Sequence, residues 1–286
     1  MEFEFYATVD SDSVGPTQHP HMPDVPYLLP ASSWSRKGMR APTLPRHVWQ
    51  TAADCGGFVA TVKWGEYRYT LDDYVAWLQS WRPSPPLWAA MMDYCCEPAI
   101  ASDKAAVRRR QQATTEMAHR TWRQHRDVPW EWVPTIQGWD PDDYREHALM
   151  LAPLIEEMAT QYAVDSDGEW AFRVGLGTLC ARASVPMIRE IVGTVHDVLD
   201  TGVGSVRLHL WGVKLGALQS GLPDAVVSAD SAAWNGRFGT SIPTAAEQGG
   251  LTQRAYGYRV ALPAYLAKVH AAIRQGRDAD AGTDAA

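Results

Sequence analysis

The sequence predicts an α/β fold, a (β/α)₈ barrel of the TIM type formed as a single domain. Short apolar segments rich in β-branched and aromatic residues recur along the chain, and segments with helical periodicity separate them. This alternation is typical of a parallel sheet, and 286 residues with 46% hydrophobic content are enough for one large barrel. A doubly wound open sheet is the alternative fold.

Eight apolar segments are expected to form the strands. Each is short and almost continuously apolar, as strands buried on both faces are. Eight strands that alternate with outer helices are enough to close a barrel. The expected strands are 3–9, 25–29, 48–53, 87–92, 132–136, 171–176, 205–210 and 225–229.

Helices are expected between these strands and after the last one. Thr70 is a suitable cap before apolar residues at helical spacing, and Pro141 suits the first turn of a helix that Asp140 would cap. An apolar stripe follows Ser-Val-Pro at 184–186. The expected helices are 70–81, 103–125, 141–163, 184–199 and 251–274.

The composition excludes several classes of protein. No apolar run approaches the roughly 18 residues of a membrane span, and the start, Met-Glu-Phe-Glu-Phe-Tyr, lacks the regions of a signal peptide. We therefore expect a soluble, cytoplasmic protein with no membrane partner. The barrel is expected to span residues 1–275, and residues 276–286, which lack apolar periodicity, to form a disordered tail.

The four cysteines predict reduced thiols rather than a disulfide framework or a zinc site. They lie in apolar segments, at positions 55, 95, 96 and 180, whereas disulfide-rich domains carry cysteines at loop spacings. Cys95 and Cys96 are adjacent without a second Cys-x-x-Cys pair, and His19-Pro-His21 has no partner at ligand spacing. No metal and no other cofactor is expected.

The net charge of −7 disfavours non-specific wrapping of nucleic acid but allows a local basic face. Two basic clusters are candidates for contacts with phosphates, although a solvated helix face is the commoner explanation of an arginine triplet. The candidates are Arg36, Lys37, Arg40 and Arg46 in one loop-like stretch, and Arg108, Arg109 and Arg110 on an expected helix.

Two aspartates close apolar segments that are expected to be buried. Asp54 precedes Cys-Gly-Gly-Phe, and Asp230 follows Val-Val-Ser-Ala. A carboxylate at the mouth of an apolar strand incurs a desolvation cost that a structural role rarely offsets, so both are candidates for catalysis. Catalytic residues of barrels come from the carboxyl ends of several strands, and Asp93 and Gln137 also follow expected strands.

Structural roles remain open for each of these residues. Asp54 can cap the turn that follows it, Asp230 can cap a helix, and Asp93 can be a buried acid paired with an arginine. Gln137 can be part of a strand-to-helix turn and have no further role. His209, beside the end of a strand, is more typical of a core histidine than of a catalyst.

Five short motifs, in this order along the chain, resemble those of the tRNA-guanine transglycosylase superfamily. Within it, residues 173–180, 211–218 and 229–234 look most like the phage and bacterial deazapurine DNA modification proteins of the DpdA type. The resemblance covers residues 48–240. The motifs are Asp-Cys-Gly-Gly-Phe at 54–58, Met-Asp-Tyr-Cys at 92–95, Ile-Gln-Gly at 136–138, Val-Gly-Leu-Gly at 174–177 and Ala-Asp at 229–230.

The resemblance implies a transferase that exchanges guanine in DNA for a 7-deazaguanine base such as preQ0. In such a family the aspartate matching Asp230 is the nucleophile, which forms a covalent sugar-enzyme intermediate, and the one matching Asp54 is the general acid and base. Displacement at an anomeric carbon passes through an oxocarbenium-like state, which one carboxylate stabilises and captures while a second carboxyl manages the proton of the leaving base.

The resemblance also implies which residues bind the base. Asp93 would accept hydrogen bonds from N1 and the exocyclic amino group of guanine, and Gln137 would donate to O6. Backbone N–H groups of the glycine motif would approach the base, and two aromatic rings would stack on its faces. The implied residues are Asp93, Gln137, Gly138, Gly175, Leu176, Gly177, Phe58 and Trp211.

The chain departs from the tRNA enzymes in ways that favour DNA as its partner. Those enzymes carry a Cys-x-Cys-x-x-Cys plus His zinc motif after the last strand, and residues 231–286 contain no cysteine. Leu176 stands where they often have a second glycine. We therefore expect a barrel without the zinc subdomain and without a separate RNA-binding domain.

Two alternative functions remain at this stage: base exchange in RNA, and a non-catalytic barrel that binds nucleic acid. Both Asp54 and Asp230 are present, which disfavours the second. The expected partners are DNA with a flipped guanine, the free deazaguanine base, and accessory proteins that open the duplex. Arginine outnumbers lysine, as in proteins of GC-rich genomes, which suggests a bacterial host cell and a phage gene.

Overall fold

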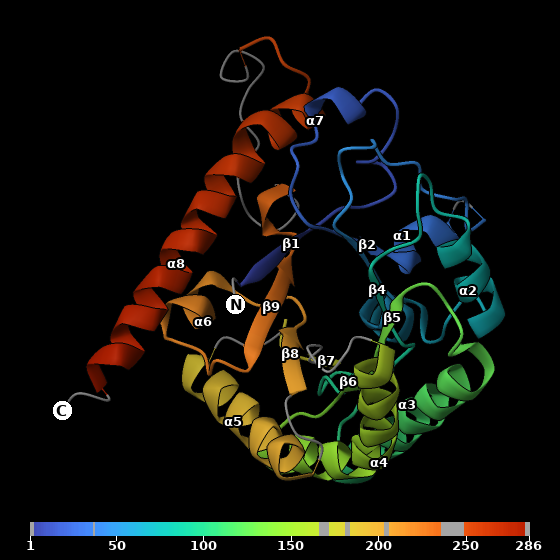
Figure 1. Ribbon diagram of the computed structural model, residues 1–286, viewed down its shortest axis with the longest axis vertical. Helices are drawn as coiled ribbons and strands as arrows, with labels where there is room; N and C mark the ends of the chain where they lie inside the picture. Colours follow the sequence, from blue (N-terminus) through green and yellow to red (C-terminus); the bar gives the residue numbers. More distant parts are fainter. Residues whose placement is uncertain are drawn as a thin grey trace.

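The computed structural model describes residues 3–36, 38–165, 172–180, 184–202, 206–235 and 249–283. Within these residues nine parallel strands form a nearly closed barrel with helices around its outside (Figure 1). The strand order is β5-β4-β3-β2-β1-β9-β8-β7-β6. The strands are β1 (Glu4–Thr8), β2 (Tyr27–Pro30), β3 (Thr51–Asp54), β4 (Trp88–Ala90), β5 (Glu131–Val133), β6 (Thr135–Ile136), β7 (Phe172–Leu176), β8 (Val206–Leu210) and β9 (Val226–Ser231).

The predicted barrel is confirmed, and the fifth expected strand is divided in two. β5 pairs with β4 and β6 pairs with β7, so the two ends of the sheet follow one another in the chain. Pro134 separates them, because proline has no N–H to donate to a strand ladder. Its carbonyl still accepts a hydrogen bond from Gly175 N at 2.9 Å. The doubly wound sheet is therefore wrong.

The main outer helices lie where the periodicity predicts them. Thr70 and Asp73 form a capping box at the start of α2, and Asp103 caps α3 by accepting from Ala106 N at 2.8 Å. The helices are α1 (Ala31–Ser35), α2 (Leu71–Gln79), α3 (Lys104–His125), α4 (Pro141–Asp165), α5 (Val185–Gly202), α6 (Leu215–Gln219), α7 (Gln253–Tyr256) and α8 (Leu262–Thr283), with short 3₁₀ or π turns η1 (His19–His21), η2 (Val59–Trp64), η3 (Ala233–Asn235) and η4 (Gly257–Ala261).

The C-terminal region differs from the expected boundary at residue 275. Helix α8 continues through Leu262–Thr283, so residues expected in a disordered tail are helical, and residues 284–286 lie outside the described residues. Gly276 packs so closely on α6 that an added Cβ would lie 2.5 Å from the carbonyl oxygen of Leu218. This tertiary contact holds a segment whose own sequence lacks apolar periodicity.

The interior of the barrel is filled by large side chains and a charged group. Trp88 Nε1 donates to the hydroxyl of Tyr6 at 2.9 Å, and the guanidinium of Arg173 lies 5.0 Å above the Trp88 ring. Arg173 Nη2 is 3.0 Å from Glu4 Oε2. These residues close the barrel below the carboxyl ends of its strands. None of the helices in the described parts of the chain has the length and apolar character needed to cross a membrane.

Candidate active site

Four polar side chains singled out in the sequence lie around one cavity at the carboxyl ends of the strands. Asp54 ends β3, Asp93 follows β4, Gln137 follows β6 and Asp230 lies near the end of β9. All four line a cavity of about 240 Å³. The structure thus brings these residues together, as the strand-end argument predicts.

Asp230 is held by donors from two neighbouring strands. The hydroxyl of Thr8, at the end of β1, donates to Oδ2 at 2.8 Å, and Gly212 N, just after β8, donates to Oδ1 at 2.8 Å. The side chain is buried, yet it lines the cavity. Both oxygens of the side chain therefore accept a hydrogen bond from the protein. Neither donor belongs to a following helix, so the alternative of a helix cap for Asp230 is wrong.

Asp54 lies in surroundings that favour its protonated form. Burial, and to a smaller degree the negative charges of Asp93 and Asp230, raise the pKa of Asp54 to about 7. Gly56 N donates to Asp54 Oδ1 at 2.8 Å and opposes this rise. The turn-capping role considered from sequence is therefore real, and it coexists with a carboxyl group that is able to exchange a proton near neutral pH.

Asp93 and Gln137 form one hydrogen-bonded unit. Gln137 Nε2 donates to Asp93 Oδ2 at 2.5 Å, and the Cys55 thiol donates to Asp93 Oδ1 at 3.2 Å. Burial raises the pKa of the Cys55 thiol well above its usual value, so it remains a neutral donor. Burial also raises the pKa of Asp93, and these hydrogen bonds oppose the rise. Uncharged groups hold Asp93, so the alternative of a buried acid paired with an arginine is wrong.

The matching family model agrees with this site. The model of the family DpdA, described as DeoxyPurine in DNA protein A, matches residues 24–259. The chain belongs to the DpdA family. The DpdA match includes every strand except β1, and thus all the polar residues of the cavity except Thr8. No curated protein matches the chain.

Two aromatic side chains predicted to stack on a base line the cavity of this DpdA-family protein. Phe58 is 38% exposed, which leaves one of its faces available to a ligand. Trp211 is half-buried, and its ring lies 4.3 Å from that of His209 and 5.7 Å from that of Trp88. Phe58 follows β3 and Trp211 follows β8, so they approach the cavity from different strands.

The glycine motif allows close packing of neighbouring side chains and offers few backbone N–H donors to a ligand. Gly175 N donates to Pro134 O, and Gly177 N donates to Ile136 O, each at 2.9 Å, so both N–H groups belong to the β6–β7 ladder. A Cβ on Gly175 would lie 2.2 Å from Trp211 Nε1. The predicted approach of these N–H groups to the base is therefore wrong.

The remaining members of that motif divide between the cavity and the protein interior. Gly177 lines the cavity, and a Cβ there would lie 2.2 Å from Gln137 Nε2. Leu176 is fully buried, and Gly138 packs against Tyr144 instead of facing the cavity. Gly138 and Gly175 let larger side chains approach closely beside the site, and Leu176 belongs to the hydrophobic core.

Three site residues escaped the sequence analysis. Thr178 donates to Gln137 Oε1 at 2.6 Å, while its own Oγ1 accepts from Cys96 N at 3.0 Å. Its φ of 55° is unusual for a β-branched residue. The Tyr67 hydroxyl bonds the backbone of Asp93. No local pattern marks Thr178 or Tyr67, whereas Thr8 ends β1 and could have been found by the strand-end rule.

The first basic cluster does not gather at the cavity. Arg36 is exposed just after α1, which directly follows β2, so it lies at the cavity end of the barrel. Arg40 O accepts from Trp77 Nε1 in the second half of α2, and Leu44 N donates to Arg82 O beyond that helix. Arg40 and Arg46 therefore lie toward the opposite end, because this stretch descends to the start of β3. Lys37 lies outside the described residues.

The second basic cluster begins at the cavity end but points in several directions. Arg108, in the first turns of α3, lies 3.9 Å from Glu146, and Arg109 is exposed. Arg110 is half-buried, and its charge opposes the rise that burial causes in the pKa of Tyr94. Among the three, Arg110 is the one directed toward residues next to Asp93.

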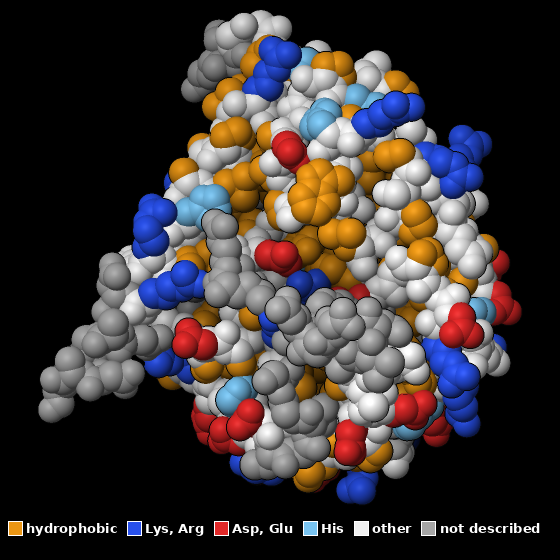
Figure 2. Space-filling view, in the orientation of Figure 1, with side chains coloured by type: hydrophobic (Ala, Val, Ile, Leu, Met, Phe, Trp, Pro, Cys, Tyr) orange, Lys and Arg blue, Asp and Glu red, His pale blue; other side chains and the backbone are white. Residues whose placement is uncertain are grey.

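Hydrophobic side chains gather in the upper centre of the face seen in Figure 2, with a few charged groups among them, and side chains of both charges lie around the edge. No group of three or more potential metal ligands occurs in the part of the chain that the structure describes. All four cysteines are free thiols, three buried and Cys180 exposed. The side chains that line the cavity carry carboxyl, amide, hydroxyl, thiol and aromatic groups.

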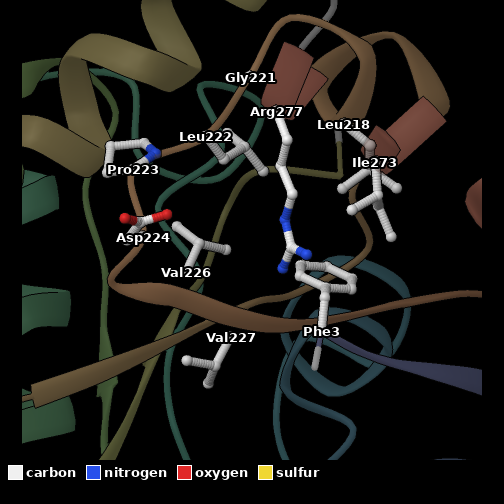
Figure 3. A pocket seen from close by; sticks show the side chains of 10 residues that line it. All are labelled: Phe3, Leu218, Gly221, Leu222, Pro223, Asp224, Val226, Val227, Ile273 and Arg277. Carbon is white, nitrogen blue, oxygen red and sulfur yellow. The ribbon is translucent and has the colours of Figure 1, made fainter. Parts of the chain in front are cut away.

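A second cavity, of about 460 Å³, lies at the opposite end of the barrel. Phe3 precedes β1 and Val226 begins β9, and Arg277 reaches from α8 toward Phe3 (Figure 3). Most of the residues that line it are apolar, and Asp224 and Arg277 are the charged side chains among them. It therefore lacks the facing carboxyl groups of the cavity at the carboxyl ends of the strands.

Proposed function

We propose that this protein exchanges guanine in DNA for a 7-deazaguanine base such as preQ0, with Asp230 as nucleophile and Asp54 as general acid and base. One observation carries the proposal: two carboxyl groups in contrasting surroundings line a single cavity. A carboxyl group that carries a proton near neutral pH suits proton transfer, and a carboxyl group whose two oxygens are held by donors suits nucleophilic attack. The family description, deoxypurine in DNA, supports DNA as the polymer.

In the first half-reaction, an oxygen of the Asp230 carboxylate attacks C1′ of the deoxyribose. The bond between C1′ and N9 of guanine breaks, its electron pair leaves with guanine, and the base takes the proton of the Asp54 carboxyl. The products are free guanine, ionised Asp54 and a deoxyribosyl ester on Asp230. A pKa of about 7 lets Asp54 carry that proton at neutral pH.

The second half-reaction reverses these steps with another base. Asp54 takes the N9 proton of the incoming deazaguanine, N9 attacks C1′, and the ester bond breaks to restore the Asp230 carboxylate. Each half-reaction conserves charge and needs no oxidant or reductant. The residues of the cavity are sufficient for both, because one carboxyl supplies the covalent bond and the other the proton.

The Asp93–Gln137 unit is suited to the edge of guanine. Each oxygen of Asp93 accepts one hydrogen bond from the protein and has a further lone pair for N1–H or the exocyclic amino group. Gln137 Nε2 uses one hydrogen on Asp93 and has a second for O6. Adenine lacks both the N1–H group and the O6 acceptor, so the unit selects guanine and 7-deazaguanine.

DNA reaches such a cavity only if the target nucleotide leaves the duplex. Extrusion costs a few kcal/mol, which stacking and edge hydrogen bonds in the pocket offset. Phe58 and Trp211 supply the stacking surfaces. The basic groups at the cavity end, Arg36 and Arg110, are our candidates for contacts with the flanking phosphates.

The proposal is tested with DNA, radiolabelled guanine and preQ0. Wild-type protein should incorporate labelled guanine into DNA, lose that label in the presence of preQ0, and form a protein–DNA adduct that survives denaturation. Asp230→Ala should do none of these. Asp224→Ala, which changes an aspartate at the opposite end of the barrel, is the matched control and should retain all three.

Two other outcomes have definite meanings. Exchange on RNA without exchange on DNA would assign the same chemistry to the other polymer. Binding of nucleic acid with no exchange and no adduct on either polymer, with folded protein, would overturn the catalytic proposal in favour of a binding barrel.

A further inference from the structure

His209 lies behind the Asp230 carboxylate in the wall of the barrel. It belongs to β8, is fully buried, and is paired in the sheet with Ser228 of β9. Its Nε2 lies 3.5 Å from Asp230 Oδ1, and its Nδ1 lies 2.9 Å from Ser228 Oγ. The ring thus connects a buried hydroxyl to the carboxylate that lines the cavity.

The neighbours of His209 determine which nitrogen carries its proton. Burial lowers the pKa of His209, so the ring is neutral and has a single N–H. The charged groups that act on it are Asp230 of β9, Glu4 of β1 and Arg173 of β7, and the Tyr6 and Trp88 rings pack against it. Because an ionised carboxylate only accepts, a proton on Nδ1 would leave two acceptors facing each other at 3.5 Å.

In the opposite arrangement no two acceptors face each other. Ser228 donates its hydroxyl hydrogen to Nδ1, and the proton is on Nε2, which has no hydrogen-bond partner among the described residues but lies 3.5 Å from Asp230 Oδ1. The Nε2 to Oδ1 distance exceeds the 2.7–3.2 Å typical of a strong N–H···O hydrogen bond. Catalytic hydrogen bonds are often long in the free enzyme and shorten when substrate binds.

We propose that His209 is a positioning residue for the nucleophile: its Nε2–H and Gly212 N–H hold Oδ1 of Asp230, and Oδ2 attacks the sugar. This inference rests on the proposed function. Among the described residues, Thr8 is the donor that Oδ2 retains. When Oδ2 forms the ester, Oδ1 becomes its carbonyl oxygen and still accepts from the same two groups, so they serve both states of Asp230.

Three substitutions at His209 separate positioning from packing. His209→Gln places an amide N–H near the position of Nε2, His209→Asn places its amide near Nδ1, and His209→Phe keeps a ring without a donor. The adduct should form at close to the wild-type rate in the Gln variant, and about 10- to 100-fold more slowly in the Asn and Phe variants. His270→Phe, on the exposed face of α8, controls for the exchange of a histidine for phenylalanine.

The tautomer is measured separately, by ¹⁵N NMR of protein labelled at histidine and assigned with the His209 variants. The expected signal is that of a neutral ring protonated at Nε2. Ser228→Ala removes the hydroxyl that contacts Nδ1. It should lower the population of the Nε2–H tautomer and slow adduct formation without lowering the amount of adduct finally formed.

The outcomes distinguish this inference from the proposed function. If wild-type protein forms no adduct with DNA or RNA, the proposed function fails, and the NMR signal still decides the hydrogen-bond arrangement of His209. If wild-type protein forms the adduct but the Gln, Asn and Phe variants are equally slow, or the ring is protonated at Nδ1, the positioning role is overturned. Thermal unfolding of each variant confirms that the protein compared is folded.

Discussion

Asp54 and Asp230 end two strands of one barrel and line the same cavity, but their local environments differ in hydrogen-bond donors and in like charge. Asp230 accepts from the Thr8 hydroxyl and from Gly212 N, with His209 behind it. Asp54 accepts from Gly56 N, and burial together with two neighbouring carboxyl groups raises its pKa to about 7. Donors hold both oxygens of Asp230, whereas desolvation and like charge favour a proton on Asp54.

Residue type and position at a strand end are therefore not enough to predict a catalytic role. Both aspartates have a barrel strand before them and a glycine-containing segment or turn beside them. We propose different roles for them because Asp230 receives donors from β1 and from the end of β8, while the charge of Asp93 acts on Asp54. Substitutions that remove one side of this contrast at a time test it.

Removing the nucleophile should have the largest effect. Asp230→Asn keeps the shape of the side chain but cannot form a stable ester, so we expect guanine exchange to fall by at least about 10⁴-fold. The measurement is incorporation of labelled guanine into DNA, with the denaturation-resistant adduct as a second signal. Adduct formation by the Asn variant would show that another group attacks the sugar.

Removing the acid should have the next largest effect and should change the pH profile. Asp54→Asn should slow guanine release by about 10²- to 10⁴-fold. A carboxyl with a pKa of about 7 is protonated below that pH, so the wild-type rate of guanine release should be level below pH 7 and fall above it. Single-turnover release of labelled guanine measures this. A decline above pH 7 that persists in the Asn variant would assign the titration to another group.

The guanine edge should depend on Asp93. Asp93→Asn replaces one acceptor oxygen by an amide donor that faces Gln137 and the N1–H side of guanine, so the affinity for guanine should fall about 5- to 150-fold. The effect should appear in KM for the free base more than in the rate at saturation. Equal losses for guanine and for a base without the exocyclic amino group would contradict recognition of that edge.

Asp54→Asn should also make the protein more stable than the wild type at high pH. The unfolded carboxyl ionises near 3.8 and the folded one near 7, so the wild type loses stability between these values as the unfolded chain releases its proton first. Asp54→Asn lacks this loss and should be more stable above pH 7 by on the order of 1–3 kcal/mol. Urea unfolding at pH 5 and pH 8 measures the difference, which should be smaller at pH 5.

The smallest expected effect concerns Thr178. Thr178→Val removes the hydroxyl that orients Gln137 and accepts from Cys96 N, which should destabilise the protein by about 1 kcal/mol and raise KM for guanine a few-fold. Thr178→Ser keeps the hydroxyl and is the matched control. A Ser variant as impaired as the Val variant would show that the methyl group, not the hydrogen bond, matters.

The sequence predicted the barrel because its signals are local. Apolar strands alternate with capped helices, and seven of the eight expected strands recur in the structure with small shifts at their ends, while the fifth is divided at Pro134. The same periodicity placed Asp54, Asp93, Gln137 and Asp230 at the carboxyl ends of strands, which a barrel brings to one face. Contacts between distant segments, such as the close packing of Gly276 against Leu218, leave no such local signal.

The sequence by itself therefore determined the fold and the set of polar residues that meet at the cavity. Only the tertiary structure decided their partners: Thr8 reaches Asp230 across 222 positions in the chain, and Cys55 and Gln137 converge on Asp93 from different strand ends. It also turned Gly175 and Leu176 into packing residues and separated Arg46 from the cavity. The reason is physical, since hydrophobic periodicity is a property of neighbours in sequence, whereas protonation and hydrogen bonding depend on which groups share a buried space.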